Sequence, residues 1–398
     1  MGKMNDFELI EDTERIIRSG VREVFVPSQP VSQNFFCGRK TEAGRIVNDV
    51  CMPGMHVLLY GDRGVGKTSL ANFACNLIIN RGLKNKAVLI RCDKNDTFNS
   101  IAQRIFEELE IRITIKSSTT KGASVSVMSA TGGKKREVET SVYYDFDSPS
   151  WVAKNICDIN CVIIIDEFDV ISDKNEKQKI STLLKNLSDR GSKVSILIVG
   201  IAFSAVELLE GHPSISRCIS EIKLNRMTEE ELLDIIEKGE ERLGITFDKD
   251  VKKKVVQSSS GFPYFTHLLS LKSSEVAILE ERETISLDMY NRALGNAIMA
   301  IEASLYEKYN NVVLEIEKRK TILYCAALIG DKDFTSKQLQ QKYKEITGVS
   351  IQQIEINNSI SKAMSEGPET ILRRKKKGVY FFNDPRMPVY IKLIQANS

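Results

Sequence analysis

The chain has 398 residues and a formal net charge of +3, with 42% hydrophobic and 27% charged residues. This balance is ordinary for globular proteins, and no apolar run approaches the roughly 18 residues that a membrane span needs. Eight scattered cysteines without a C-x-x-C pair, and only three histidines, argue against a zinc site or a disulfide framework. The length exceeds what one hydrophobic core normally serves, so we expect two or three domains.

The start of the chain is polar and acidic and does not resemble a targeting peptide, so a cytoplasmic location is expected. Residues 7 to 19 place apolar side chains among charges. This pattern predicts a short amphipathic helix or a docking arm, within an N-terminal arm of residues 1–25. An extended segment then leads to Phe36-Cys37-Gly38-Arg39, and residues 41 to 50 have a helical pattern.

A glycine-rich run follows the apolar strand of residues 57 to 60 and opens a helical pattern, which is the context that a G-x-x-x-x-G-K-[ST] phosphate loop requires. Glycines let several backbone N–H groups point at one phosphate chain. Lys67 is then placed to bind the β- and γ-phosphates, and the Thr68 hydroxyl to ligate Mg²⁺. The predicted nucleotide-binding residues of this loop are Gly61, Asp62, Arg63, Gly64, Val65, Gly66, Lys67, Thr68 and Ser69.

The chain continues with an apolar strand at residues 87 to 90 and a helix at about 99 to 110. Residues 111 to 147 are rich in Ser, Thr, Gly and Lys, with two alternating arms around a Gly132-Gly133 turn. We interpret them as an inserted β-hairpin, with a disordered loop as the alternative.

A buried strand at residues 161 to 165 ends in two carboxylates, Asp166 and Glu167. In nucleotide hydrolysis the two carboxylates of such a pair have different roles. Asp166 is placed to hold Mg²⁺, and Glu167 is placed to act as the catalytic base toward water. Adjacent carboxylates after a strand are common, but this pair lies about 100 residues after a phosphate loop, as such a partner does.

Two further polar positions follow. The strand at residues 194 to 199 continues into Gly200-Ile201-Ala202-Phe203-Ser204, where only Ser204 could face a γ-phosphate. Arg217 precedes a short strand at residues 221 to 224 and could stabilise charge on the nucleotide of a neighbouring subunit, which makes it a candidate catalytic residue. An ordinary surface arginine remains the alternative.

The composition changes at Leu224, which closes the predicted core of residues 26–225. Residues 226–311 predict a helical lid that opens with a capping box at Thr228 and contains the break Gly261-Phe262-Pro263. Residues 312–398 predict three helices and two strands, at 370 to 374 and 379 to 382, which make a winged-helix domain with 15 Lys and Arg against 9 Asp and Glu. The hairpin formed by these two strands, which we call the basic wing, carries Arg373, Arg374, Lys375, Lys376 and Lys377.

The order of these motifs resembles the AAA+ and STAND class of P-loop ATPases, and within it the prokaryotic branch similar to origin-recognition initiator ATPases. The resemblance implies an α/β fold: a three-layer αβα core with a parallel sheet, a helical lid and a C-terminal winged helix, with ATP and Mg²⁺ as cofactors. It also implies that Gly38 and Arg39 lie beside the adenine and that Pro263 contacts the nucleotide from the lid. The sequence departs from the family where the strand ending at Val199 lacks a convincing polar sensor and His267 replaces an arginine, so we expect a slow ATPase.

Three kinds of function remain open. The first is an ATP-driven switch that oligomerises and engages DNA or a partner protein; the others are a DNA-binding protein with ATP as a structural ligand, and a nucleotide-gated scaffold without nucleic acid. The basic wing could contact DNA phosphates. The expected recognition helix, residues 351 to 366, carries Glu355 and Glu366 and suits a polyanion poorly, so a solvated charged face is the alternative.

Overall fold

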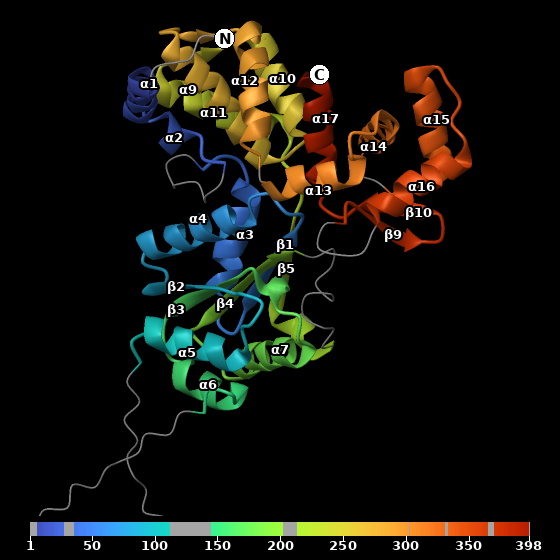
Figure 1. Cartoon of the computed structure of the whole chain (residues 1–398). Helices are drawn as coiled ribbons and strands as arrows, with labels where there is room; N and C mark the ends of the chain where they lie inside the picture. Colours follow the sequence, from blue (N-terminus) through green and yellow to red (C-terminus); the bar gives the residue numbers. More distant parts are fainter. Residues whose placement is uncertain are drawn as a thin grey trace, which may run out of the picture.

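The computed structural model describes residues 6–27, 36–111, 145–201, 213–301, 303–330, 333–364 and 370–397. Figure 1 shows an α/β core, a helical lid above it that is also contacted by the N-terminal helices, and a C-terminal domain beside the lid. Most of the predicted insertion, and Ser204, lie outside the described residues.

The core contains a five-stranded sheet in which all neighbouring strands run parallel, in the order β2-β3-β4-β1-β5. Its three central strands, β3, β4 and β1, are buried apolar runs, as expected for a parallel sheet covered on both faces, whereas the edge strands β2 and β5 are only partly buried. The phosphate loop leaves β1, which pairs with β4 on one side and β5 on the other. The strands are β1 (His56–Gly61), β2 (Lys86–Arg91), β3 (Cys161–Asp166), β4 (Ser195–Ile201) and β5 (Ile219–Leu224).

Helices cover both faces of this sheet, so the predicted three-layer αβα core is confirmed. α3 (Lys40–Val50) and α4 (Lys67–Asn80) share one apolar cluster with alternate residues of the strands. The second cluster joins the opposite strand face to α5 (Phe98–Glu108), α6 (Pro149–Ile156) and α7 (Lys174–Asp189). Short 3₁₀ turns, η2 (Phe168–Val170) and η3 (Pro213–Arg217), follow β3 and precede β5.

The lid begins where the capping box at Thr228 was predicted. The Thr228 hydroxyl accepts a hydrogen bond from the Glu231 N–H, and the Glu231 carboxylate accepts one from the Thr228 N–H. The two N-terminal helices pack against lid helices, so the predicted arm docks on the lid. The elements are α1 (Asp6–Arg18), α2 (Val21–Val24), α9 (Glu229–Leu243), β6 (Thr246–Phe247), α10 (Lys249–Ser259), α11 (Pro263–Leu279), β7 (Thr284–Ile285) and α12 (Leu287–Met299).

The C-terminal region has the predicted three helices and hairpin, with two additional elements, β8 and α17. β8 adds a third strand to an antiparallel sheet of order β8-β10-β9, and α17 packs against α14, α12 and α10. The last helix therefore ties this region to the lid, and the predicted boundary at residue 312 falls inside α13. The elements are α13 (Ala303–Val313), α14 (Glu317–Ile329), β8 (Phe334–Thr335), α15 (Ser336–Thr347), α16 (Gln353–Ala363), β9 (Leu372–Lys376), β10 (Val379–Phe382) and α17 (Met387–Asn397).

Candidate functional site

The phosphate loop requires glycine at each of its three glycine positions. Gly61 has φ 153°, and a Cβ there would lie 2.3 Å from the carbonyl oxygen of Leu224 on β5. Gly64 and Gly66 have φ of 83° and 92°, which side chains rarely tolerate. The local sequence therefore fixes a turn that sends the chain from β1 directly into α4.

Lys67, the first residue of α4, folds its side chain back under the loop. Its Nζ donates to the carbonyl oxygens of Gly61 at 3.1 Å and Asp62 at 2.7 Å. Burial lowers the pKa of Lys67 to about 8, although the nearby carboxylates of Asp169 and Asp166 oppose this shift. An arriving phosphate chain would supply the negative charge that this buried ammonium lacks.

Thr68 and Asp166 form the predicted pair for a metal ion. The Thr68 Oγ1 donates to the Asp166 Oδ2 at 2.9 Å, and Asp166 is only 3% exposed. No group of three or more His, Cys, Asp or Glu side chains suited to a metal occurs among the described residues. A hydroxyl, one carboxylate and nucleotide phosphates are the oxygen ligands that Mg²⁺ prefers, so this pair fits Mg²⁺.

Glu167 lies at the end of β3 in the left-handed region, with φ 57°. This conformation is costly for glutamate, and its N–H donates to the Asp166 Oδ1 at 2.9 Å. The side chain is exposed and lines the cavity at the loop. This backbone conformation places the Glu167 carboxylate at the cavity, and its role as a catalytic base stays a prediction.

Asp169 is a site residue that the sequence analysis missed. Its Oδ1 accepts a hydrogen bond from the N–H of Ile201, at the end of β4, at 2.7 Å. It therefore links the turn after Glu167 to the end of the neighbouring strand. The spacing Asp166-Glu167-Phe168-Asp169 was the available signal, since η2 returns the third carboxylate to the same edge.

One cavity of about 760 Å³ brings most of the predicted site residues together. Gly61 and Asp62 lie behind it, where their carbonyl groups hold Lys67. The predicted residues that line the cavity are Arg39, Arg63, Gly64, Val65, Gly66, Lys67, Thr68, Ser69, Asp166, Glu167 and Pro263.

Gly38 and Arg39 join the core to the lid. Arg39 lines the cavity but is only 4% exposed, and its Nη1 lies 3.5 Å from the Glu42 Oε1 and 3.9 Å from the Glu231 Oε2. Its N–H also donates to the Glu231 Oε1 at 2.9 Å, and a Cβ on Gly38 would lie 2.8 Å from that same oxygen. The Arg39 guanidinium therefore lies between Glu42 of α3 and Glu231 of α9. Its contact with adenine stays a prediction.

Pro263 and His267 belong to α11 and face the cavity from the lid. Pro263 is the first residue of the helix, and its Cγ would lie 3.7 Å from a Cβ on Gly66. The Nδ1 of His267 accepts a hydrogen bond from the Val26 N–H at 3.3 Å, and burial lowers the pKa of His267 to about 4. His267 is thus a neutral ring and cannot replace a lid arginine.

The structure does not bring Arg217 to this cavity. Arg217 ends η3 and is exposed, and β5 begins two residues later beside His56, the first residue of β1. It therefore lies at the edge of the sheet opposite the phosphate loop. Its role toward a neighbouring subunit stays a prediction.

Arg386, from the C-terminal domain, also reaches the phosphate loop. Its Cδ lies 3.0 Å from the position of a Cβ on Gly64, and its guanidinium lies 5.9 Å from the ring centre of Tyr264 in the lid. The Nη2 pairs with the Asp384 Oδ2 at 2.8 Å, and Arg386 is 4% exposed. Sequence reasoning missed this contact, because nothing local links a segment beyond residue 380 to the loop.

Comparisons with known proteins give the family. The model of the novel STAND NTPase 1 family matches residues 27–330, so the chain belongs to that family. Among curated proteins, no sequence matches the chain. No helix in the described part of the chain is long and apolar enough to cross a membrane.

Two solved structures show the same fold. The chain is similar to the ORC2 protein of Aeropyrum pernix, solved as ADPNP–ADP complexes, with 17% identity, a TM-score of 0.53, and coverage of 94% of this chain and 98% of that one. It is also similar to a Walker-type ATPase of Pyrococcus abyssi, with 14% identity, a TM-score of 0.51, and coverage of 90% and 96%. The fold is therefore that of STAND and AAA+ P-loop ATPases resembling origin-recognition initiators.

The buried Lys67 ammonium leads to a prediction about protons. In the free protein its pKa is about 8, and phosphates should raise it, so ATP binding near or above that pH should take up a proton. Titration calorimetry at about pH 8.5, in buffers of different ionisation enthalpy, measures this uptake, since the terminal phosphate is already ionised there. Buffer-independent heats, or near-normal ATP affinity in Lys67→Ala, would contradict the assignment.

Proposed function

We propose that this member of the novel STAND NTPase 1 family is a slow ATPase that acts as a molecular switch. It binds ATP with Mg²⁺, hydrolyses it, and uses the nucleotide state to control how its C-terminal domain engages DNA or a partner protein. The observation that carries this proposal is the contact of Arg386 with Gly64, because it places the C-terminal domain directly on the loop that holds phosphate.

The residues that line the cavity support hydrolysis, because each step has its own group. The backbone of the loop and Lys67 bind the phosphates, and Glu167 takes a proton from water as its oxygen attacks the terminal phosphorus. Thr68 and Asp166 would hold Mg²⁺, which neutralises charge on the phosphates. Hydrolysis is slow in this proposal because His267, which lines the cavity from the lid, is neutral.

Glu167→Gln should bind ATP with near-normal affinity but lose at least about 100-fold in turnover, because the amide cannot accept the proton from water. Phosphate release under saturating ATP and calorimetric ATP affinity check the two halves of this statement. Turnover equal to that of the unmodified chain would move the base to another residue, with Asp169 the next to test.

The Arg386 contact supports coupling between nucleotide and C-terminal domain. The backbone of Gly64 belongs to the turn that wraps phosphate, so any rearrangement there shifts the surface on which Arg386 rests. A ligand can move a conformational equilibrium only through such differential contacts. The same guanidinium lies near Tyr264, so the loop, lid and C-terminal domain respond together.

We expect the pair Arg386→Met with Asp384→Asn to uncouple the domains, since the double change leaves no lone buried charge. In a Glu167→Gln background, small-angle scattering should give different radii of gyration with ATP and ADP, and this difference should vanish in the double variant. Lys375→Gln with Asp333→Asn removes an exposed ion pair of the same domain, 2.6 Å long, and is the matched control. A radius independent of nucleotide before any of these changes would contradict the switch.

Assembly through Arg217 is part of the proposal. The residue is exposed and lies at the edge of the sheet opposite its own phosphate loop. A second copy could therefore present its nucleotide to Arg217 without rearrangement of the first core. This placement favours a catalytic role between subunits over one within the chain.

The basic wing supports contact with nucleic acid phosphates. All of Arg373 to Lys376 on β9 are exposed. Lys375 pairs with Asp333, and the Arg374 guanidinium lies 5.8 Å from the ring centre of Tyr380. Within the described residues, Arg373, Lys376 and Lys377 have no ion pair, so their charge is available to a polyanion.

Neutralising Arg373, Arg374, Lys375, Lys376 and Lys377 to Gln should weaken duplex DNA binding about equally for unrelated sequences. The salt dependence should become shallower, because fewer counterions are released. Fluorescence anisotropy across a salt series with ATP and with ADP measures both effects, and ATP turnover without DNA should persist. If the unmodified protein shows no salt-sensitive binding in either state, the domain docks a partner protein instead.

A further inference from the structure

Arg91 is a cation at the phosphate edge of the sheet that the proposed mechanism has not used. It is the last residue of β2 and lies in register with Asp166 on the parallel strand β3. Residues in register on adjacent strands are about 5 Å apart and point to the same face. Arg91 therefore lies on the face of the sheet that carries the metal-binding carboxylate, and its exposed side chain lines the same cavity.

A polar network behind Arg91 holds its backbone in place. The Arg104 Nη1 donates to the Arg91 carbonyl oxygen at 2.8 Å, while its Nη2 pairs with the Asp96 Oδ2 at 2.6 Å. Asp96 also accepts hydrogen bonds from the Asp93 N–H at 2.8 Å and the Ser100 hydroxyl at 2.7 Å. Burial opposes the ionisation of Asp96, but these donors lower its pKa overall, so the carboxylate stays charged.

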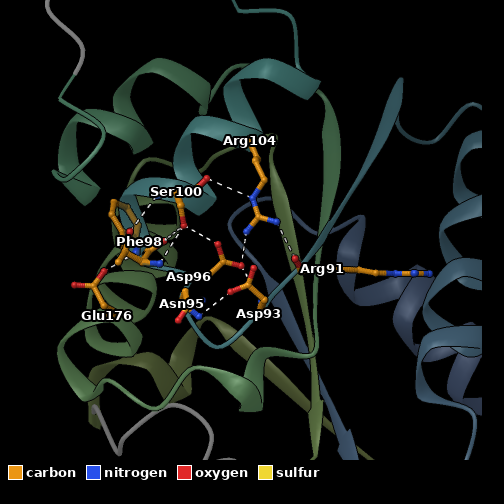
Figure 2. A network of polar contacts seen from close by, with 9 residues as sticks. Arg91, Asp93, Asn95, Asp96, Phe98, Ser100, Arg104 and Glu176 are labelled. Carbon is orange, nitrogen blue, oxygen red and sulfur yellow. Dashed lines mark hydrogen bonds and ion pairs between the residues drawn. The ribbon is translucent and has the colours of Figure 1, made fainter.

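Figure 2 shows that the Arg91 side chain extends away from this network, although its carbonyl group belongs to it. Within the described residues its guanidinium has no ion pair and no side-chain hydrogen bond. A β-strand end that is fixed on one side and presents a cation on the other is preorganised for an anion.

Two other cations of the cavity already have partners among the described residues, and Arg63 belongs to the phosphate loop itself. Lys67 is held by two loop carbonyl groups, and Arg39 by Glu42 and Glu231. His267 is neutral, and β4 ends at this edge without a polar side chain within its described residues. The cavity also has three carboxylates, Asp166, Glu167 and Asp169, which repel an anion, and Arg91 adds positive charge in register with Asp166.

We propose that Arg91 is a catalytic residue that contacts the terminal phosphate of bound ATP from within the same chain. It takes the place of the polar sensor that β4 lacks, and Arg104 and Asp96 are its positioning residues. This inference rests on the proposed ATPase function and names the residue that distinguishes ATP from ADP.

In the step it assists, an oxygen of water forms a bond to the terminal phosphorus while the bond from that phosphorus to the bridging oxygen breaks. The proton of the water passes to Glu167, and the electron pair of the broken bond remains on ADP. The guanidinium donates to the non-bridging oxygens of the transferring phosphoryl group, where charge is spread in the transition state. ADP has no such group, so Arg91 should add little to ADP binding.

The test uses the full chain with Arg91→Gln, Arg91→Lys and Lys94→Gln. Lys94 is an exposed cation of the same loop that does not line the cavity, so Lys94→Gln removes the same charge and is the matched control. In a Glu167→Gln background, Arg91→Gln should lower the affinity for ATP at least about 10-fold and the affinity for ADP less than about 2-fold. With Glu167 intact, turnover should fall at least about 100-fold, and Arg91→Lys should recover part of it.

Arg104→Gln tests the positioning role. It should lower both turnover and the preference for ATP over ADP, each by less than Arg91→Gln does. Thermal unfolding should show that both variants are folded. Equal losses of ATP and ADP affinity, or a response of Arg91→Gln equal to that of Lys94→Gln, would overturn the inference while leaving the ATPase proposal intact. Failure of the unmodified chain to bind either nucleotide would overturn both.

Discussion

The site depends on one close backbone approach, between Gly61 at the end of β1 and the carbonyl oxygen of Leu224 on β5. Only a residue without a Cβ lets β1 end there and turn at once into the phosphate loop. In open parallel sheets, ligands bind outside the carboxyl ends of the strands, and here β2, β3 and β4 end at the same edge. Arg91 and Asp166, which are in register on neighbouring strands, therefore lie at the edge of the sheet where the phosphate loop leaves β1 and line the same cavity as the loop.

Arginines join the three parts of the molecule around that loop. Arg39 links the start of α3 to α9, Arg226 lies 3.8 Å from the Asp62 carboxylate at the entrance to the lid, and Arg386 brings in the C-terminal domain. Of these contacts, the Arg39–Glu231 pair is the one between largely buried charges that joins the core to the lid, and breaking such a pair leaves an uncompensated charge. Motion of the lid should accordingly be a change between two packed states rather than a gradual opening, which is what a switch requires.

A feature could be predicted from the sequence where the residues that form it lie close together along the chain. The phosphate loop and Asp166 were predictable because their motifs are local and parallel strands place their ends together, and the same locality holds for the capping box at Thr228. The contact of Arg39 with Glu231 was not predictable, because the two residues lie 192 positions apart in the sequence. α17 was missed because six of its eleven residues are buried, so it lacks the one-sided pattern that identifies surface helices.

The neutrality of His267 changes how the lid responds to nucleotide. A lid arginine would be attracted to the phosphates directly, but a buried ring with a pKa of about 4 carries no charge near neutral pH. It instead accepts a hydrogen bond from Val26 and lies edge-on to Phe25, so it joins the segment before the core to α11. Closure of this lid must therefore be sensed through packing, as in the approach of Pro263 to Gly66, while charge recognition is left to the core. In the proposed switch, that division separates nucleotide binding from the positioning of the domains, so slow hydrolysis does not weaken the switch.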